Sequence, residues 1–400
     1  MFTLIAETAS EIEVTETLIV GLMLIAALVG IAVSRLRLPY TVALVLAGLL
    51  LGLSGVFSAI NLTSELILLV FLPPLLFEGA INMDLDDLVL RWKQVAALAV
   101  IGTGISAVLI TLPLIVMPGI PVEFAIVLAV ILAATDPVSV LAIFKEHGVG
   151  TGLRTLMEGE SIFNDALAIV LFLIAVEVAF GEETVTVLDG FVEFGQEVAI
   201  GVAVGAVVGF LAHRLMGSLD DHLVEITLSL VTAYGAYLLA DRLHGSGVIA
   251  VVAAGLLIGN FGTRLAMSAS SRVMLLEFWE VLAFLANSAL FLLIGLEFDV
   301  ADMKGDTLIA TVVAIVAMLV ARAVIAYGLL PIVGRSKVAP VPKSWWTAVF
   351  WGGLRGSIPI ALILGIEQRT FGGIDAVTVV FGVVLFSLVV QGLTYKPVLD

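Results

Sequence analysis

The stretch Glu158-Gly-Glu-Ser-Ile-Phe-Asn-Asp165 places polar side chains inside a long hydrophobic segment of the chain. Because an α-helix turns by about 100° per residue, Ser161 lies one turn before Asp165. Glu160 and Asn164 have the same spacing, so the four side chains share one face of a helix. A charged side chain at the middle of a bilayer costs about 2.5–3.5 kcal/mol on insertion scales, and such residues usually line an ion or proton path. Carboxylate, hydroxyl and amide oxygens are hard ligands, so this face suits a hard cation.

The composition of the whole chain is that of a membrane protein. Of its 400 residues, 61% are hydrophobic and 13% are charged, whereas soluble domains contain about 25% charged residues. Apolar runs of about 20 residues, long enough to span a bilayer as helices, recur along the entire length. We count about 13 such segments, at residues 18–34, 40–57, 66–81, 95–116, 124–144, 156–180, 198–215, 223–239, 248–261, 275–296, 308–332, 346–366 and 377–394. The sequence therefore predicts an all-α polytopic membrane protein.

The positions of lysine and arginine predict the orientation of these segments. With the N-terminus outside, three of the 18 basic residues fall in outer connections, two within spans and thirteen in inner connections. This asymmetry follows the positive-inside rule and predicts a multi-pass protein of the cell (plasma) membrane, with an outer N-terminus and a cytoplasmic C-terminus. The net charge of −16 is concentrated in outer segments, where it forms either a hydrated acidic surface or a field that concentrates cations.

Several classes of function are disfavoured by what the sequence lacks. Without cysteine, the chain has no disulfide, thiolate metal site or cysteine nucleophile, and its four histidines fall near predicted loops. Zinc motifs are absent, and Ser161 and Ser357 have no buried histidine or lysine to activate them. We therefore expect that the protein is not an enzyme, holds no cofactor and has no nucleic acid as a partner.

Ionisable residues near the middle of the predicted spans are the main functional signal. There are six of them: Glu78, Asp136, Glu160, Asp165, Arg322 and Arg355. Unpaired, they would cost on the order of 15–20 kcal/mol, so they must pair, accept protons or bind ions. Four acids against two arginines leave an excess of two negative charges, which a cation carrier needs and an inert bundle would avoid. Arg322 cannot lose its proton, and we expect it to form a structural pair with Glu160, for which Arg355 is the competing partner.

Two spans are predicted to be interrupted. Pro137 lacks an N–H and disfavours a helical Asp136 before it, so the span 124–144 should break there, next to the hydroxyl and carbonyl of Thr135. The stretch Gly352-Gly-Leu-Arg-Gly-Ser-Ile-Pro359 should interrupt the span 346–366 in the same way. The alternatives are a proline kink for packing at the first site and a close helix contact at the second.

The two interrupted spans are the fifth and the twelfth. They lie seven helices apart, and an odd shift inverts topology, so they can belong to inverted repeats that cross near the midplane. Glu78 follows Pro73 and Pro74, which should kink the third span. Its carboxylate either reaches the ion cavity from the side or is a snorkelling or capping acid.

Over essentially its whole length, the chain resembles the monovalent cation:proton antiporter family of the sodium/proton exchanger type, which includes archaeal and bacterial NhaP-type proteins. The motifs that carry the resemblance are, in chain order, Phe77-Glu78-Gly79, Thr135-Asp136-Pro137, Glu160-Ser161 with Asn164-Asp165, Ala321-Arg322-Ala323, Gly353-Leu354-Arg355-Gly356 and Val390-Gln-Gly-Leu-Thr394. The Asn-Asp pair together with Gly-Leu-Arg-Gly makes the resemblance highly specific.

The resemblance implies an inverted-repeat fold of thirteen helices that forms a homodimer in membrane lipid. Helices 1–3 (residues 1–92) and 8–10 (217–300) would form the dimerisation scaffold. Helices 4–6 (93–181) and 11–13 (301–400) would form a moving core, with helix 7 (182–216) as the linker. The resemblance also implies a set of Na⁺ ligands, with Asn164 in support and Glu78 near the site. These ligands are Thr135, Asp136, Ser161 and Asp165.

The expected mechanism is competition between Na⁺ (or Li⁺) and H⁺ at Asp165. Desolvation and the neighbouring acids Asp136 and Glu160 disfavour the bare carboxylate, so protons can contest the site with Na⁺. A core that moves only when the site is occupied would exchange the ions by alternating access. Related electrogenic carriers have a second Asp at the position of Asn164 and a Lys at the position of Arg322. Because Asn and Arg release no proton, we expect electroneutral exchange of one Na⁺ for one H⁺.

Other transport functions fit parts of the pattern. A K⁺/H⁺ antiporter of the same fold could use the same ligands, because selectivity depends on cavity size and ligand number. A channel would need a filter-like run of carbonyls, which the sequence does not contain. A carrier of organic anions would gain nothing from an acid-rich site.

Overall fold

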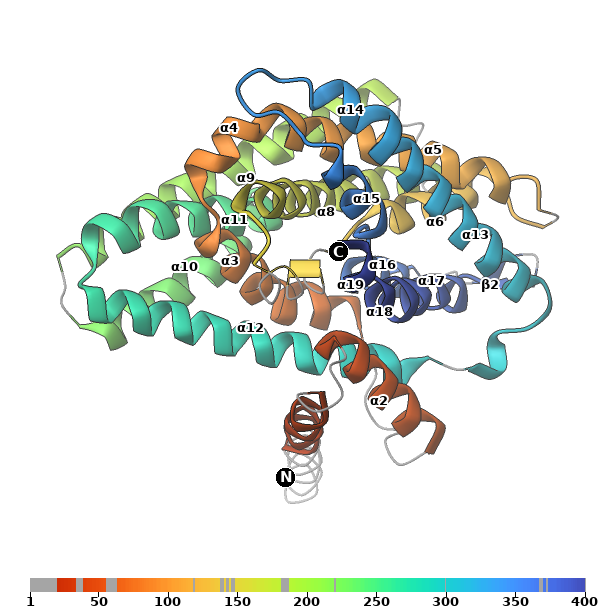
Figure 1. Ribbon diagram of the computed structural model, residues 1–400, viewed down its shortest axis with the longest axis horizontal. Coiled ribbons are helices and arrows are strands. Elements are labelled where there is room, and N and C mark those ends of the chain that lie inside the picture. The colour runs from red at the N-terminus through yellow and green to blue at the C-terminus, as the bar shows by residue number, and fades with distance from the viewer. Residues whose placement is uncertain are drawn as a thin grey trace, which may run out of the picture.

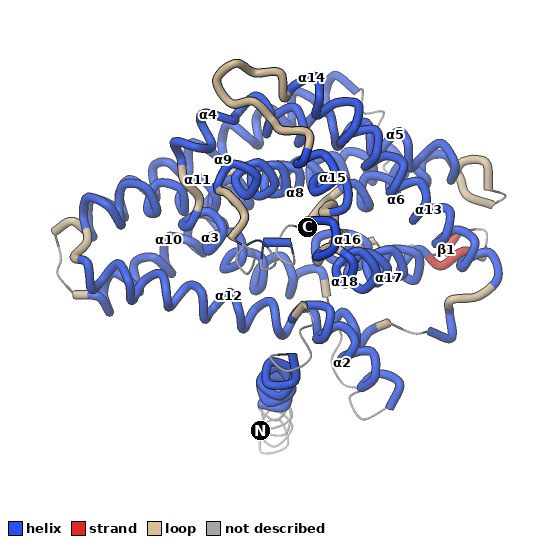
Figure 2. Tube along the Cα trace, viewed as in Figure 1, coloured by secondary structure: helices blue, strands red, loops and turns tan. Residues whose placement is uncertain are grey.

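The computed structural model describes residues 20–33, 39–54, 63–117, 119–136, 140, 141, 144, 148–180, 187–218, 221–298, 300–366, 370, 371 and 373–399. Figure 2 shows that these residues are almost entirely helical, with short loops between the helices. Two short antiparallel strands, β1 (Thr370–Phe371) and β2 (Ile374–Asp375), form a small hairpin in which Phe371 pairs with Ile374.

The helices of the first half of the chain run as follows. They are Val20–Val33, α2 (Tyr40–Ser54), η1 (Leu66–Phe71) continuing into α3 (Leu72–Asn82), α4 (Leu85–Ala96) continuing through η2 (Ala97–Gly102) into α5 (Thr103–Leu114), α6 (Val122–Ala133), α8 (Thr151–Phe180) and α9 (Val187–Met216).

The second half continues the same pattern. Its helices are α10 (His222–Arg242), α11 (Gly247–Leu257) with η3 (Ile258–Ala266), α12 (Ala269–Glu297), η4 (Val300–Asp302), α13 (Gly305–Val324) with η5 (Ile325–Leu329) and α14 (Leu330–Val333), α15 (Ser344–Trp351), α16 (Ser357–Leu364), α17 (Ala376–Phe386) with η6 (Ser387–Gln391) and α18 (Gly392–Thr394), and α19 (Lys396–Leu399).

The number and character of these helices fit a polytopic membrane protein. Within the described ranges, 7 helices are long and apolar enough to cross a membrane, and further apolar helices of 10–17 residues accompany them. Together with the divided helix α15–α16, they correspond to the predicted spans. The predicted fold class, an all-α polytopic membrane protein, is confirmed.

The fourth span begins earlier than the sequence predicted. Its helix starts at Leu85 rather than at residue 95, because the Asp84 side chain caps it by accepting hydrogen bonds from two backbone N–H groups of the first turn (2.9 and 3.3 Å). The hydrophobic run identified only the later part of this helix. The predicted boundary between residues 92 and 93 therefore falls inside α4.

The helices pack in two groups. In the first, α12 lies against α2 and α3, and α11 lies against α3, α9 and α10. In the second, α8 lies against α4 and α6, and α13 lies against α5 and α17. In the view of Figure 1, α12 runs along the lower side and α13 along the upper right, with α8 and α16 between them. The first group contains helices assigned to the scaffold, together with α9, which falls in the range assigned to the linker. The second contains helices assigned to the core, together with α4, most of which falls in the range assigned to the scaffold. The division by residue ranges stays a prediction.

Glycine lets two helices of the first group touch backbone to backbone. A Cβ atom on Gly48 of α2 would lie 2.1 Å from the carbonyl oxygen of Leu292 in α12. A Cβ atom on Gly295 of α12 would lie 2.1 Å from the carbonyl oxygen of Val45. Small residues allow this close approach, which packs membrane helices by dispersion contacts. A larger residue at either glycine would force the two helices apart.

The interruption of α6 comes slightly before the predicted position. The helix ends at Ala133, and the backbone of Ala134 is extended (φ −59°, ψ 138°). Thr135 and Asp136 follow as non-helical residues. Pro137, on which the prediction of the break depended, lies outside the described residues. The carbonyls at the end of α6 are therefore free of helical partners at the level of Thr135.

The second interruption separates α15 from α16. Residues 352–356 between them are non-helical. The backbone N–H of Asp136 donates a hydrogen bond of 2.9 Å to the carbonyl oxygen of Leu354. The two interrupted segments thus meet, and the internal inverted repeat to which they were assigned stays a prediction.

Candidate functional site

Two polar side chains of α8 hold the interrupted end of α6. The Ser161 hydroxyl donates a hydrogen bond to the carbonyl oxygen of Thr135. The Asn164 Nδ2 group donates to the carbonyl oxygen of Ala133 (3.2 Å) and to the Thr135 hydroxyl (3.3 Å). Non-helical backbone at membrane depth is tolerated only when its polar groups find such partners. Polar side chains of α8 therefore satisfy backbone groups that have no helical partner at the end of α6.

The interrupted segment between α15 and α16 forms the opposite wall. A Cβ atom on Gly356 would lie 2.1 Å from Oδ2 of Asp136. The carboxylate therefore lies directly against the backbone of this segment, at a distance that only glycine permits. Together with the Asp136–Leu354 hydrogen bond, this contact fixes both the backbone and the side chain of Asp136.

Glu160 and Arg322 form a buried ion pair. Nη1 of Arg322 donates to Oε1 of Glu160, and Nη2 donates to Oε2 at 3.1 Å. Nε of Arg322 donates to the carbonyl oxygen of Val349 at 2.8 Å. The two residues are 2% and 4% exposed. Arg322 and Arg355 were both predicted as possible partners of Glu160, and the structure places Arg322 beside it. Gly353 leaves room for this arginine, because a Cβ atom on Gly353 would lie only 2.4 Å from Arg322 Nε.

Arg355 lies in the second interrupted segment and is fixed there through its backbone N–H. Its N–H donates to the Ser387 hydroxyl at 3.0 Å, and the residue is 1% exposed. In the described part of the chain, Nε and Nη1 of its guanidinium have no hydrogen-bond partner. The group lies near enough to Asp165 and Glu160 for their charges to interact.

Asp165 is buried without a fixed counterpart. It is 8% exposed, and no hydrogen bond from the other described residues reaches its carboxylate. Its electrostatic neighbours are Asp136, of the same charge, and Arg355. A buried carboxylate that lacks hydrogen bonds is costly in its charged form. This position therefore favours the binding of a proton or a cation.

A narrow crevice lies between the two interrupted segments. It is lined by Thr135, Asp136, Met157, Glu160, Ser161, Arg322 and Gly352. Asp165 lies one turn further along α8 from Ser161. A larger cavity of about 300 Å³ lies among α8, α9, α10 and α11, and its lining contains none of the predicted site residues.

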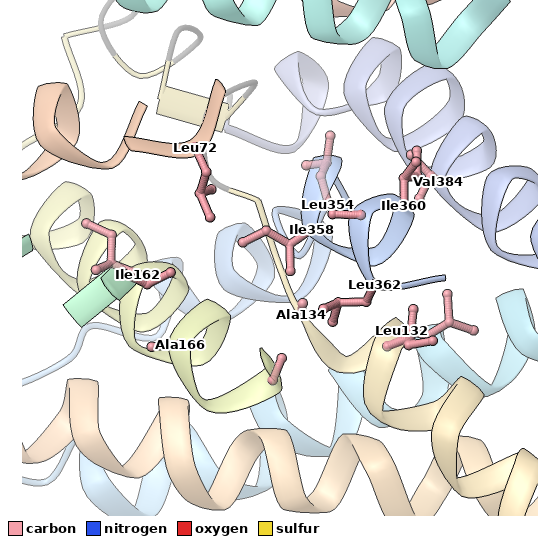
Figure 3. Packing of buried hydrophobic residues seen from close by; sticks show 14 of the residues in the cluster. Leu72, Leu132, Ala134, Ile162, Ala166, Leu354, Ile358, Ile360, Leu362 and Val384 are labelled. Carbon is pink, nitrogen blue, oxygen red and sulfur yellow. The ribbon is translucent and has the colours of Figure 1, made fainter. Parts of the chain in front are cut away.

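Apolar side chains close off the surroundings of the site. Figure 3 shows Ile162 and Ala166 of α8, Leu72 of α3 and Ile358 of α16 near the interrupted segment at Ala134. All five are buried. Buried apolar side chains therefore surround the interrupted segment on this side of α8.

Glu78 lies on α3, outside the crevice lining. Its Oε1 accepts a hydrogen bond of 2.9 Å from Asn82 Nδ2 within the same helix. The next residue, Gly79, faces α8, because a Cβ atom on it would lie 3.9 Å from Cδ1 of Ile162. The structure therefore places Glu78 at the neighbouring helix, half-buried, and its part in ion binding stays a prediction.

A second ion pair on α8 was not predicted from the sequence. Nε of Arg154 lies 2.8 Å from Oε1 of Glu158, and Glu158 is 3% exposed. The i, i+4 spacing of opposite charges was the available signal. The contacts of Ser387 and Leu354 with the interrupted segments were also missed, and no local pattern indicates them.

Comparisons with known proteins identify the family and the fold of the chain. Residues 22–400 match the family described as sodium/hydrogen exchanger, transmembrane. The Na⁺/H⁺ antiporter ApNhaP of Aphanothece halophytica is 43% identical over 368 residues, which cover 91% of this chain and 70% of the relative. The Na⁺/H⁺ antiporter NhaH of Halobacillus dabanensis is 35% identical over 382 residues, covering 92% and 93%. The solved structure of the sodium proton antiporter MjNhaP1 from Methanocaldococcus jannaschii is similar in fold, with a TM-score of 0.76, 21% identity, and coverage of 95% and 96%.

Proposed function

The chain belongs to the sodium/hydrogen exchanger family, whose members are membrane transporters and not enzymes, and we propose that it exchanges Na⁺ or Li⁺ for H⁺ across the membrane. One observation carries the proposal. Asp165 is buried beside Asp136 with no hydrogen bond from the described residues, while the neighbouring Glu160 is neutralised by Arg322. The exchanged ion would be the missing partner of Asp165.

The proposed Na⁺ ligands are oxygens that the site already gathers. They are the carboxylates of Asp165 and Asp136 and the oxygens of Thr135 and Ser161. Ser161 and Asn164 bind the end of α6, which supports a binding site that is formed before the ion arrives. Asn164 would hold this end in place, and Glu78 would act from the neighbouring helix. A hard cation surrounded by such oxygens replaces its hydration shell at small cost.

Competition at Asp165 would couple the two ions. A bare buried carboxylate is unfavourable, so the site holds either a proton or Na⁺. If the core moves past the scaffold only when Asp165 is neutralised, each Na⁺ that crosses in one direction is matched by a proton in the other. Alternating access around this residue then gives exchange without a leak.

Electroneutral 1:1 stoichiometry is part of the proposal. Asn164 cannot titrate, and Arg322 keeps its proton at any physiological pH. Glu160 is occupied by Arg322 at both carboxylate oxygens, which supports a fixed and not an exchangeable charge. Asp165 would then be the one carrier that exchanges a proton for Na⁺ in each cycle.

The test is ion exchange in proteoliposomes that carry a pH-sensitive dye. Asp165→Asn should reduce Na⁺-driven proton movement to the level of protein-free liposomes. Asp306→Asn, the same change at an exposed position, is the matched control and should exchange like the wild type. Wild-type exchange by Asp165→Asn would refute competition at this residue.

Two further measurements in the same liposomes test the selectivity among cations and the stoichiometry of exchange. Na⁺, Li⁺ and K⁺ are added in turn, and a response to K⁺ alone would identify a K⁺/H⁺ antiporter that uses the same ligands. A membrane potential is then imposed at a fixed pH gradient. Exchange that responds to the potential would contradict the 1:1 stoichiometry, while leaving competition at Asp165 intact.

A further inference from the structure

Polar residues form a stripe along the first half of α8. Arg154, Glu158, Ser161 and Asp165 follow each other at i, i+4, i+7 and i+11. At about 100° per residue they fall within roughly 60° of one another on the helix, and they extend over about 16 Å. The stripe begins at the end of α8 that the distribution of lysine and arginine assigns to the cytoplasm. It ends at the proposed ion-binding carboxylate.

The same face of α8 is apolar beyond Asp165. Ala168 and Phe172 occupy it there, and both are buried. A cation moving along α8 would therefore meet oxygen ligands on one side of Asp165 and hydrocarbon on the other.

The stripe follows the seam between α3 and the end of α6. Ser161, at one edge, donates a hydrogen bond to the carbonyl of Thr135 at the end of α6. Ile162, beside the other edge, approaches Gly79 of α3. Gly159 lies further around the helix and packs against Val95 of α4. By helix geometry, Glu158 falls between Ser161 and Ile162, on the side of the seam and away from the contact of Gly159 with α4.

The Arg154–Glu158 ion pair has one exposed member and one buried member. The Arg154 side chain is 42% exposed and the Glu158 side chain is 4% exposed, with 2.8 Å between Nε and Oε1. Arg154 is the partner of Glu158 among the described residues. A guanidinium that is half in solvent can leave at little cost, whereas the buried carboxylate is then unfavourable in its charged form until it binds a cation or a proton.

We infer that Glu158 is a docking carboxylate for the incoming cation and that Arg154 is the latch that occupies it between ions. The inference rests on the proposed exchange at Asp165. An entering Na⁺ takes the place of the Arg154 guanidinium on Glu158, and Arg154 turns outward into solvent. The ion then moves about 10 Å along the stripe, past Ser161, to Asp165. When Arg154 returns to Glu158, it closes the approach.

The inference predicts effects on one side of the membrane. In proteoliposomes of uniform orientation, Glu158→Gln should raise the KM for Na⁺ added at the Thr151 end of α8 by roughly tenfold, the order expected when a steering charge is lost. KM from the opposite side and the maximal rate should stay within about twofold of the wild type, as a charge on the approach path affects entry and not turnover. Arg154→Gln should lower KM from the Thr151 side. Lys93→Gln, which removes an exposed cation from the same end of the molecule, should change neither value.

A structural role for the pair gives a different result. Both variants would then lower the melting temperature and leave the KM for Na⁺ equal on the two sides, which would overturn the inference. If Asp165→Asn abolishes exchange but Glu158→Gln changes the KM for Na⁺ equally on both sides, the proposed function stands and the latch is refuted. Wild-type exchange by Asp165→Asn would discard the proposed function itself.

Cysteine labelling provides a second measurement if Glu158→Gln does not fold. The chain contains no cysteine, so Glu158→Cys introduces a single thiol. A positively charged methanethiosulfonate reagent should modify this thiol from the Thr151 side only, and Arg154→Gln in the same chain should accelerate the reaction. Equal labelling from both sides, or labelling from neither, would overturn the inference.

Discussion

Two acids lie five residues apart on α8, and their surroundings differ: among the described residues, Glu160 has a paired arginine and Asp165 does not. Glu160 is bound at both oxygens by Arg322, whose third donor goes to the carbonyl of Val349. Asp165 has no such partner among the described residues, and the nearby Arg355 leaves Nε and Nη1 of its guanidinium without hydrogen bonds. The same helix therefore holds one carboxylate that is neutralised permanently and one that is not.

The difference separates structure from transport. A buried charge costs several kcal/mol unless it is paired. At Glu160 the cost is met by a partner that cannot lose its charge, which fixes α8 to α13 and to the end of α15. At Asp165 the charge would be neutralised only when a proton or Na⁺ binds. Variants at these residues test whether Glu160 is purely structural and whether Asp165 alone binds the exchanged ion.

The largest effect is expected at the permanent pair. Arg322→Gln leaves Glu160 buried and unpaired, and should lower the free energy of unfolding by about 3–5 kcal/mol. Denaturation in mixed micelles measures the loss. The double variant Glu160→Gln with Arg322→Gln removes both charges and should recover most of it. If the single and double variants lose the same stability, the pair is not a structural unit.

The second prediction concerns the unpaired acid. A ligand that binds only the folded state stabilises it by about 2.7 kcal/mol at 100 times its Kd. Saturating Na⁺ should therefore raise the unfolding free energy of the wild type by about this amount. The same Na⁺ should leave Asp165→Asn unchanged. Without Na⁺ this variant should be at least as stable as the wild type, since it removes a buried charge that has no hydrogen-bonded partner among the described residues. Na⁺ stabilisation that survives in Asp165→Asn would place the bound ion elsewhere.

The residues of this contrast could be found from the sequence because burial makes charges rare. Arg322 stands alone in a hydrophobic span, and Arg cannot neutralise itself by losing a proton, so a buried acid had to be its partner. Pro137 and the glycines at 352–356 marked the interrupted helices because they remove hydrogen bonds or permit unusual backbone. The span pattern followed from hydropathy alone.

The contacts between the two interruptions could not be found in this way. The hydrogen bond from Asp136 to Leu354 depends on the register of segments more than 200 residues apart, and local patterns carry no information on register. Likewise, the carbonyls of Ala133 and Thr135 at the end of α6 accept hydrogen bonds from Asn164 and Ser161 of another helix, and no local pattern indicates these contacts. The absence of hydrogen bonds at Nε and Nη1 of Arg355 among the described residues is also a result of tertiary packing, since its residue type indicated a pair.

The third prediction tests the wall opposite Asp165. Gly356→Ala would place a Cβ 2.1 Å from Oδ2 of Asp136, so the carboxylate must move away from the site. We expect the KM for Na⁺ to rise about tenfold, or about 1.4 kcal/mol, with a much smaller loss of stability than in Arg322→Gln. Gly104→Ala, where a Cβ would meet no atom within 4 Å, is the control. An unchanged KM in Gly356→Ala would mean that the position of Asp136 is not critical for binding.

The smallest effect is expected at Ser161, which belongs to the exchangeable half of the contrast and not to the permanent pair. Ser161→Ala removes the hydrogen bond to the Thr135 carbonyl, a net loss of about 1 kcal/mol, and also one proposed Na⁺ ligand. Measured as the Na⁺ dependence of proton exchange, KM should rise by about fivefold, as 1.4 kcal/mol is a factor of ten. Ser106→Ala, at a buried serine of α5, should leave KM unchanged. Ser161→Thr keeps the hydroxyl and should restore most of the affinity, because the effect follows the oxygen atom. If Ser161→Ala lowers stability but not affinity, Ser161 belongs with Glu160 as a structural residue, and the boundary between the two halves lies closer to Asp165.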